Sequence, residues 1–211
     1  MSEQFDKKEH WETIYSTKEH NQVSWFQQTP TISLELIESL GLNKDASIID
    51  VGGGDSILAE HLLKEGYTDI TVVDISQHAI DRAKNRIGAN ASKINWIVSD
   101  ILDFHPNRIY DLWHDRATFH FLTEENEVNT YRNIVKSAVR MNGHLVIGTF
   151  SLNGPTKCSG IPIKQYSQHS LSDVFSENFE LISASEVDHP TPFETVQNFI
   201  FGTFQRIEIS E

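Results

Sequence analysis

The sequence predicts an α/β fold in which helices cover both faces of a mostly parallel sheet. Short apolar runs alternate with stretches of helical periodicity over residues 47–150, and this alternation is typical of parallel strands joined by helices. Two strand-like runs follow each other near the C-terminus and predict an antiparallel pair. A chain of 211 residues suits one domain. We therefore expect a single domain over residues 1–211, with a helical cap (1–42), the alternating core, and a long loop followed by the strand pair (151–211).

Two helices are expected ahead of the first strand. In the stretch Phe5–Lys18, Trp11 and Tyr15 are four residues apart and share one helical face. A second apolar stripe begins at Pro30, a residue favoured at helix entry, and ends at Gly41, a residue favoured after a helix.

Strands and helices then alternate along the chain. A helix is expected at residues 57–65. Two more are expected after Ser76 and after Thr123, because the side chains of serine and threonine can cap a helix. A short helix near residues 170–176 precedes the runs FELISASEV and VQNFIFGTFQRI, which predict the antiparallel pair. The strands expected in the core are Ser47–Val51, Ile70–Ser76, Ile94–Asp100, Tyr110–Asp115 and His144–Phe150.

Composition and charge argue against several functions and locations. Asp and Glu number 30 against 17 Lys and Arg, a net charge of −13. Since a nucleic-acid site needs cations that neutralise phosphates, and no basic run occurs, we expect no nucleic-acid partner.

Cys158 is the only cysteine, so no internal disulfide can form. The polar N-terminus and the lack of a long apolar run predict a cytoplasmic protein that does not contact a membrane. The scattered histidines show no metal-site spacing, and the sequence leaves the oligomeric state open.

The stretch IIDVGGGDS marks a ligand site at the first strand end. Ligands in open parallel sheets bind beyond the carboxyl ends of the strands, where Gly52–Gly54 follow Asp50. A dinucleotide fingerprint would place a third glycine where Ile57 stands. The missing glycine and the preceding carboxylate both favour a positively charged ligand group over a pyrophosphate.

Two further carboxylates end the next two strands. Asp74 stands 24 residues after Asp50, at the place where an acid can accept the hydroxyls of a ribose. Asp100, followed by the apolar Ile101, could bind the amino group of an adenine and cover its ring. Each acid could instead only cap a helix. Together they suit a cationic amino acid, a ribose and an adenine, which are the parts of S-adenosylmethionine.

From Ile48 to Gly148 the sequence resembles the class I S-adenosylmethionine-dependent methyltransferases. The resemblance rests on the glycine turn together with the acids at the ends of successive strands. It implies a Rossmann-like, seven-stranded sheet of order 3-2-1-4-5-7-6, with strand 7 antiparallel and helices on both faces. Residues 47–150 would be its cofactor-binding core. Ser56 departs from the family, because many members have a glycine there.

The resemblance also implies a role for each matching residue. Two segments, HWETIYSTKEHNQVSWFQ and DLWHDRATFHFL, resemble a group of small bacterial methyltransferases of unassigned substrate, and HDRATF is loosely similar to a motif of lysine methyltransferases. The residues implied to bind the cofactor are Asp50, Gly52, Gly53 and Gly54 (methionine part), Asp74 (ribose), Asp100 and Ile101 (adenine), and, with no part of the cofactor assigned, Trp25 and Ile75.

The methyl acceptor is expected beyond the fourth strand. His114 and Asp115 follow that strand and could orient or deprotonate the acceptor, or could be structural. Tyr15, Cys158 and His189 are the candidates for substrate contact, Cys158 because it lies in the polar loop 151–167.

The predicted function is methyl transfer from S-adenosylmethionine to an N, O or S atom, with a small molecule preferred as acceptor. Three alternatives stay open: a protein lysine methyltransferase, an NAD(P)-dependent oxidoreductase, and a module that binds S-adenosylmethionine without chemistry.

Overall fold

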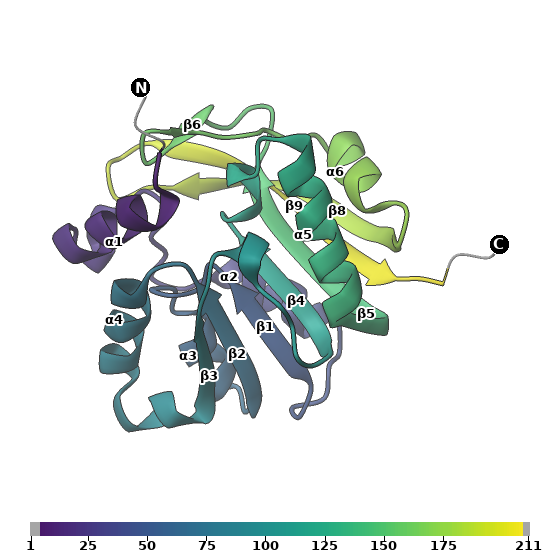
Figure 1. The fold of residues 1–211 in the computed structure, drawn as a ribbon, viewed down its shortest axis with the longest axis horizontal. Coiled ribbons are helices and arrows are strands. Elements are labelled where there is room, and N and C mark those ends of the chain that lie inside the picture. The colour runs from purple at the N-terminus through teal and green to yellow at the C-terminus, as the bar shows by residue number, and fades with distance from the viewer. Residues whose placement is uncertain (1–4, 209–211) are drawn as a thin grey trace.

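The computed structural model describes residues 5–208 and contains a seven-stranded sheet of order β3-β2-β1-β4-β5-β9-β8 (Figure 1). Only β9 runs antiparallel to its neighbours. A separate two-stranded hairpin, β6 with β7, lies in the loop after β5. Apart from that hairpin, the order is the predicted 3-2-1-4-5-7-6, and the fold class is confirmed. The strands are β1 (Ser47–Val51), β2 (Asp69–Asp74), β3 (Ile94–Val98), β4 (Tyr110–Arg116), β5 (Val139–Phe150), β6 (Lys157–Cys158), β7 (Ile161–Pro162), β8 (Phe179–Pro190) and β9 (Val196–Arg206).

Helices cover both faces of the sheet, with α5 and α6 in front of it and α2 and α3 behind it in Figure 1. Successive strand residues point to opposite faces, so Ile49 packs in the core with Tyr131 of α5 whereas Ile48 packs with Ile37 of α2. The helices are α1 (Lys7–Thr17), α2 (Thr31–Ser39), α3 (Leu58–Lys64), α4 (Gln77–Ile87), α5 (Glu125–Ala138) and α6 (Gln168–Phe175), with short 3₁₀ turns η1 (His20–Gln22), η2 (Gly88–Lys93), η3 (Ile101–Asp103) and η4 (Phe119–Phe121).

Most predicted boundaries are confirmed to within a few residues, and one predicted cap is wrong. The Ser76 hydroxyl caps α4 by accepting from the Ala79 N–H, as expected. Helix α5 is capped by Glu124 instead of Thr123, because the Glu124 and Glu127 side chains form a reciprocal capping box. Residue Thr123 lies one position too early and only donates its backbone N–H to Glu127.

Segments far apart in the sequence meet at the carboxyl ends of the parallel strands. Helix α1 lies beside α4 above these strand ends (Figure 1). Strand β8 runs parallel to β5, because both are antiparallel to β9. The end of β8 therefore reaches the same edge of the sheet, as predicted. Within residues 5–208, the helices all fall short of the length and apolar character needed to cross a membrane.

Candidate active site

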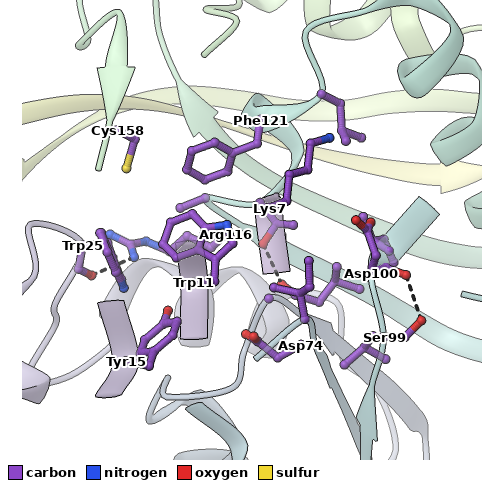
Figure 2. Close-up of a pocket in the computed structure, with 18 residues that line it drawn as sticks. Lys7, Trp11, Tyr15, Trp25, Asp74, Ser99, Asp100, Arg116, Phe121 and Cys158 are labelled. Carbon is purple, nitrogen blue, oxygen red and sulfur yellow. Dashed lines mark hydrogen bonds between the residues drawn. The ribbon is translucent and has the colours of Figure 1, made fainter. Parts of the chain in front are cut away.

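A cavity opens at the carboxyl ends of β1 to β4, next to helix α1 (Figure 2). Its empty volume, which includes open solvent at the mouth, is about 800 Å³. Asp74 and Asp100 line one side, called here the carboxylate side. Trp25, Arg116 and Cys158 line the other, called here the arginine side. The cavity thus brings together residues predicted to bind cofactor and residues predicted to bind substrate.

The glycine turn after β1 makes room for the carboxylates beside it. Gly52 has a φ of +68°, which L side chains rarely adopt. A Cβ atom on Gly53 would lie 2.1 Å from Oδ2 of Asp50, and one on Gly54 would lie 2.7 Å from the carboxyl group of Asp74. The turn is therefore bare because two acidic side chains occupy the space where its own side chains would stand.

Asp74 ends β2 and lies on the cavity wall, where it is only 5% exposed. Its Oδ2 accepts from the Gly54 N–H at 3.0 Å, and its Oδ1 accepts from the Ser76 N–H at 2.8 Å. Burial raises the pKa of this carboxyl to about 6, against the lowering effect of the two hydrogen bonds. When ionised, each oxygen keeps a further lone pair, so the group can accept ribose hydroxyls as predicted.

Asp100 serves both as a cap and as part of the cavity wall. Its Oδ1 accepts from the Leu102 N–H at 2.9 Å and caps η3. Because a carboxylate has two oxygens, capping leaves one for a ligand. Ile75 and Ile101 line the same cavity and supply the apolar surface that a planar base needs.

Asp50 is held by a buried hydrogen-bonded chain. His114 Nδ1 lies 2.7 Å from Asp50 Oδ1, and His114 Nε2 lies 2.9 Å from the Ser33 hydroxyl. Asp50 and His114 are each 2% exposed. The other oxygen of Asp50, Oδ2, is buried and has no hydrogen-bond partner. Both line a second cavity of about 580 Å³ that adjoins the first through Tyr15, Trp25, Gly52 and Arg116.

The arginine side carries a guanidinium beside uncharged groups. Arg116 Nη1 donates to the Trp25 carbonyl at 3.1 Å, while its Nε atom is buried without a partner. Burial raises the pKa of the Cys158 thiol to about 12, so it stays protonated at neutral pH. Burial also raises the pKa of Tyr15 well above its ordinary value. These two side chains therefore act as neutral groups.

Comparison with known proteins agrees with the predicted family resemblance. A family model described as a methyltransferase domain matches residues 48–143, which contain the glycine turn and all three strand-end acids. The match covers slightly less than half of the chain, and it shows that this segment is similar to the class I methyltransferases. The cofactor of this class is S-adenosylmethionine. The predicted family and cofactor are thereby confirmed.

Relatives of this methyltransferase domain act on different acceptors. Malonyl-acyl-carrier-protein O-methyltransferase 1 of Ilyobacter polytropus is 26% identical over 76% of the chain, which spans only 62% of that relative. EEF1A lysine methyltransferase 2 of Danio rerio is 24% identical, covering 92% of the chain and 80% of the relative. The structure of N-methyltransferase NodS from Bradyrhizobium japonicum with S-adenosylhomocysteine has a TM-score of 0.70 at 18% identity, covering 96% of this chain and all of that one. The similarity to the NodS structure supports the fold alone.

The residues of the methyltransferase site fit S-adenosylmethionine on three observations. The unpartnered Oδ2 of Asp50 suits the ammonium group of a methionine, because a buried carboxylate oxygen needs a donor. Asp74 suits the ribose, and the glycine turn lets a ligand approach bare backbone. Positions predicted from the sequence alone thus lie on adjoining cavity walls.

Neither of the two residues predicted to be catalytic lines the first cavity, although His114 lines the second. Asp115 is fully buried; its Oδ1 accepts from the Thr118 and Phe119 N–H groups, and its Oδ2 accepts from the Tyr131 hydroxyl at 2.7 Å. Both ring nitrogens of His114 are occupied as well. A catalytic base must come within hydrogen-bond reach of the proton it removes. In this geometry Asp115 holds the turn after β4 and His114 orients Asp50, and a catalytic role for either residue stays a prediction.

His189 lies beside the methyltransferase cavity but does not line it. Its Nε2 donates to the Ser24 carbonyl at 2.8 Å, and burial together with the charge of Arg116 lowers its pKa to about 4. It lines a separate open groove between the start of α2 and the strand pair β8–β9, which also reaches Arg116. Substrate contact by His189 stays a prediction, and such contact would take place in this groove.

Sequence reasoning did not identify three residues that support the site. Arg116 was assigned no role in binding. Glu12 of α1 accepts from the Ser76 hydroxyl at 2.7 Å, which fixes α1 over the cavity. Asp55 binds Arg82 and Arg86 of α4, at 3.0 and 2.7 Å, and so fixes the end of the glycine turn. No local pattern marks these pairs, since their partners are distant in sequence. Separately, the Ser56 hydroxyl accepts from the Leu58 N–H at 3.1 Å, although the N-cap residue of α3 is Ile57.

Proposed function

We propose that this chain transfers a methyl group from S-adenosylmethionine to an N, O or S atom of a small molecule. The observation that carries the proposal is the row of strand-end carboxylates, Asp50, Asp74 and Asp100, along two adjoining cavities that continue to the arginine side. When bound, S-adenosylmethionine supplies an electrophilic methyl group on a sulfonium sulfur.

The protein's own contribution would be orientation and exclusion of water. Trp11, Trp25 and Phe121 form a cluster of aromatic rings with centroids 5.2 to 5.7 Å from Trp11, and all three line the cavity. Rings of this kind shield a reacting centre from water and have faces that attract a cation. Alignment of bound reactants alone accounts for large accelerations, so the mechanism needs no base from His114 or Asp115.

A protein lysine is the second candidate acceptor. The similarity to EEF1A lysine methyltransferase 2 over 92% of the chain favours it. A lysine ammonium is repelled by the guanidinium of Arg116 and must lose a proton before it can attack, so we prefer the small molecule. A nucleic acid is disfavoured by the net charge of −13. Since Cys158 is the only cysteine, a reducing compartment suits the chain, and we propose that it works in the cytoplasm.

Calorimetry with two ligands tests the proposal. S-adenosylhomocysteine is expected to bind with a one-to-one stoichiometry and NADH is expected not to bind. Binding of NADH alone would support an oxidoreductase instead. Transfer of labelled methyl groups to a panel of small thiols, acids, phenols and amines, with a lysine-containing protein panel alongside, then separates the acceptor classes. Cofactor binding without transfer to any acceptor would favour a non-catalytic module.

A further inference from the structure

Arg116 lacks the ion pair that a buried arginine ordinarily has. Within residues 5–208 no carboxylate lies within salt-bridge distance of it, although Arg82 and Arg86 both bind Asp55. Its polar contact is the Trp25 carbonyl, and its Nε has no partner. Burying an unpaired charge costs free energy, so this guanidinium is held at a cost that a bound anion would offset.

The surroundings of Arg116 favour an anionic ligand, and not a carboxylate side chain of the protein, as the partner of its guanidinium. The face of Phe199, on β9, lies 4.8 Å from the guanidinium carbon. Cys158 lines the same cavity as a neutral thiol, and His189 in the adjoining groove is neutral as well. Asp50 lines the second cavity with Arg116 but forms no ion pair with it, so the guanidinium, which lies against an aromatic face, is suited to bind a planar anion.

Arg116 also lies where an acceptor would have to be bound. It lines the cofactor cavity and, from another side, the open groove next to Phe199 and His189. Figure 2 shows it on the opposite side of the cavity from Asp100. The arginine side holds no side chain poised to remove a proton, since Cys158 and Tyr15 stay protonated at neutral pH. An acceptor that enters already ionised needs no such base.

We propose that Arg116 binds an anionic group of the methyl acceptor, so that the substrates of this site are small molecules that bind as monovalent anions. The inference rests on the proposed function, because it assigns the arginine side to the acceptor. The competing occupant is the carboxylate of the cofactor itself, since Arg116 also lines the second cavity with Asp50.

Matched acids and amides test the inference on the full chain loaded with S-adenosylhomocysteine. Acetate, benzoate and phenylacetate are each titrated against the corresponding neutral amide by calorimetry. We expect at least one acid to bind ten times more tightly than its amide. Arg116→Met is expected to remove that preference while changing the affinity for S-adenosylhomocysteine less than threefold, and Arg116→Lys is expected to keep part of it. Lys93→Met, which removes one exposed positive charge ahead of β3, serves as the control and should behave as the wild type.

Three outcomes would overturn the inference. The first is equal binding of acid and amide in every pair by the wild type, a result that does not depend on whether any variant folds. The second is a preference that persists in a folded Arg116→Met. The third is a large loss of S-adenosylhomocysteine affinity in that variant, which would assign Arg116 to the cofactor carboxylate. A wild type that binds no S-adenosylhomocysteine would instead refute the proposed function, and is seen before any acid is added.

Discussion

The carboxylate side and the arginine side of the cavity are built in different ways. On the carboxylate side, Asp74 and Asp100 each stand within two residues of the end of a strand. On the arginine side, Trp25 comes from the link between η1 and α2, Arg116 from the end of β4, and Cys158 from the loop after β5. The carboxylate side is assembled from strand tips alone, whereas the arginine side combines one strand tip with a link and a loop that are distant in sequence.

This difference separates what is constant from what can change. Strand tips are fixed by the sheet, so the carboxylate side is committed to one ligand shape. Loops and links tolerate substitution more easily, so the arginine side can differ among relatives that share the cofactor.

The largest expected effect comes from the glycine turn on the carboxylate side. In Gly52→Ala the new Cβ would lie 1.8 Å from the Thr118 hydroxyl, at a φ of +68°. We expect the affinity for S-adenosylhomocysteine, measured by calorimetry, to fall at least a hundredfold. Gly160→Ala is the control, because Gly160 has a similar φ of +82° with no atom within 4 Å of the added Cβ. Gly160→Ala should lose only about 1 to 2 kcal/mol of stability through backbone strain and should bind S-adenosylhomocysteine like the wild type. Equal affinities in the two variants would contradict the steric role of the turn.

Asp74→Asn is expected to have the next largest effect. Loss of a charged acceptor for the ribose hydroxyls corresponds to about 1.5 to 3 kcal/mol, so the dissociation constant of S-adenosylhomocysteine should rise roughly 10- to 150-fold. Asp69→Asn, at the opposite end of β2, is the matched control and should bind normally. Unchanged binding by a folded Asp74→Asn would remove Asp74 from the site.

The pH dependence of cofactor binding tests whether the ionised form of Asp74, on the carboxylate side, binds the ligand. The pKa of Asp74 is raised to about 6 by burial, and ribose hydroxyls donate to its ionised form. The affinity for S-adenosylhomocysteine should therefore fall as pH drops below 6, by about tenfold at pH 5.

The effect of the Asp74 carboxyl on folding stability has the opposite dependence on pH. Because the folded pKa exceeds the unfolded value, the native state binds more protons between about pH 4 and 6, and stability declines as pH rises through that window. Calorimetry from pH 5 to 8 measures the binding effect, and Asp74→Asn should make the profile flat.

Tyr131→Phe is expected to have the smallest effect on cofactor binding. The hydroxyl of Tyr131 donates to Asp115 and accepts from the Trp113 indole N–H at 2.9 Å. Its removal leaves two buried polar groups unpaired, so we expect a loss of about 1 to 3 kcal/mol in the free energy of unfolding, measured by urea denaturation. Affinity for S-adenosylhomocysteine and turnover should change less than twofold. A large drop in turnover with normal stability would restore the catalytic role predicted for Asp115.

The fold and the carboxylate side could be predicted from the sequence because their signals are local. The alternation of apolar runs predicts the parallel sheet, and strands in a parallel sheet end at one edge. Acids at residues 50, 74 and 100 therefore had to lie near one another once the strands were placed. The reversed strand β9 follows from two adjacent runs joined by a short connection.

The functions of Asp115 and Arg116 could not be predicted because they depend on distant partners. The two residues are adjacent at the end of β4, so their side chains point in opposite directions. Asp115 faces Tyr131 in the core, whereas Arg116 faces the cavity. The sequence alone does not tell which of the two faces the site. For the same reason the contact between Glu12 and Ser76, 64 residues apart, carries no local signal.

The most direct test of the central claim is a crystal structure with S-adenosylhomocysteine bound. We expect ribose hydroxyls within hydrogen-bond distance of Asp74, the adenine between Ile75 and Ile101 with its amino group at Asp100, and the ammonium group at Asp50 Oδ2. A nucleoside bound elsewhere, or carboxylates that make no contact with it, would contradict the account.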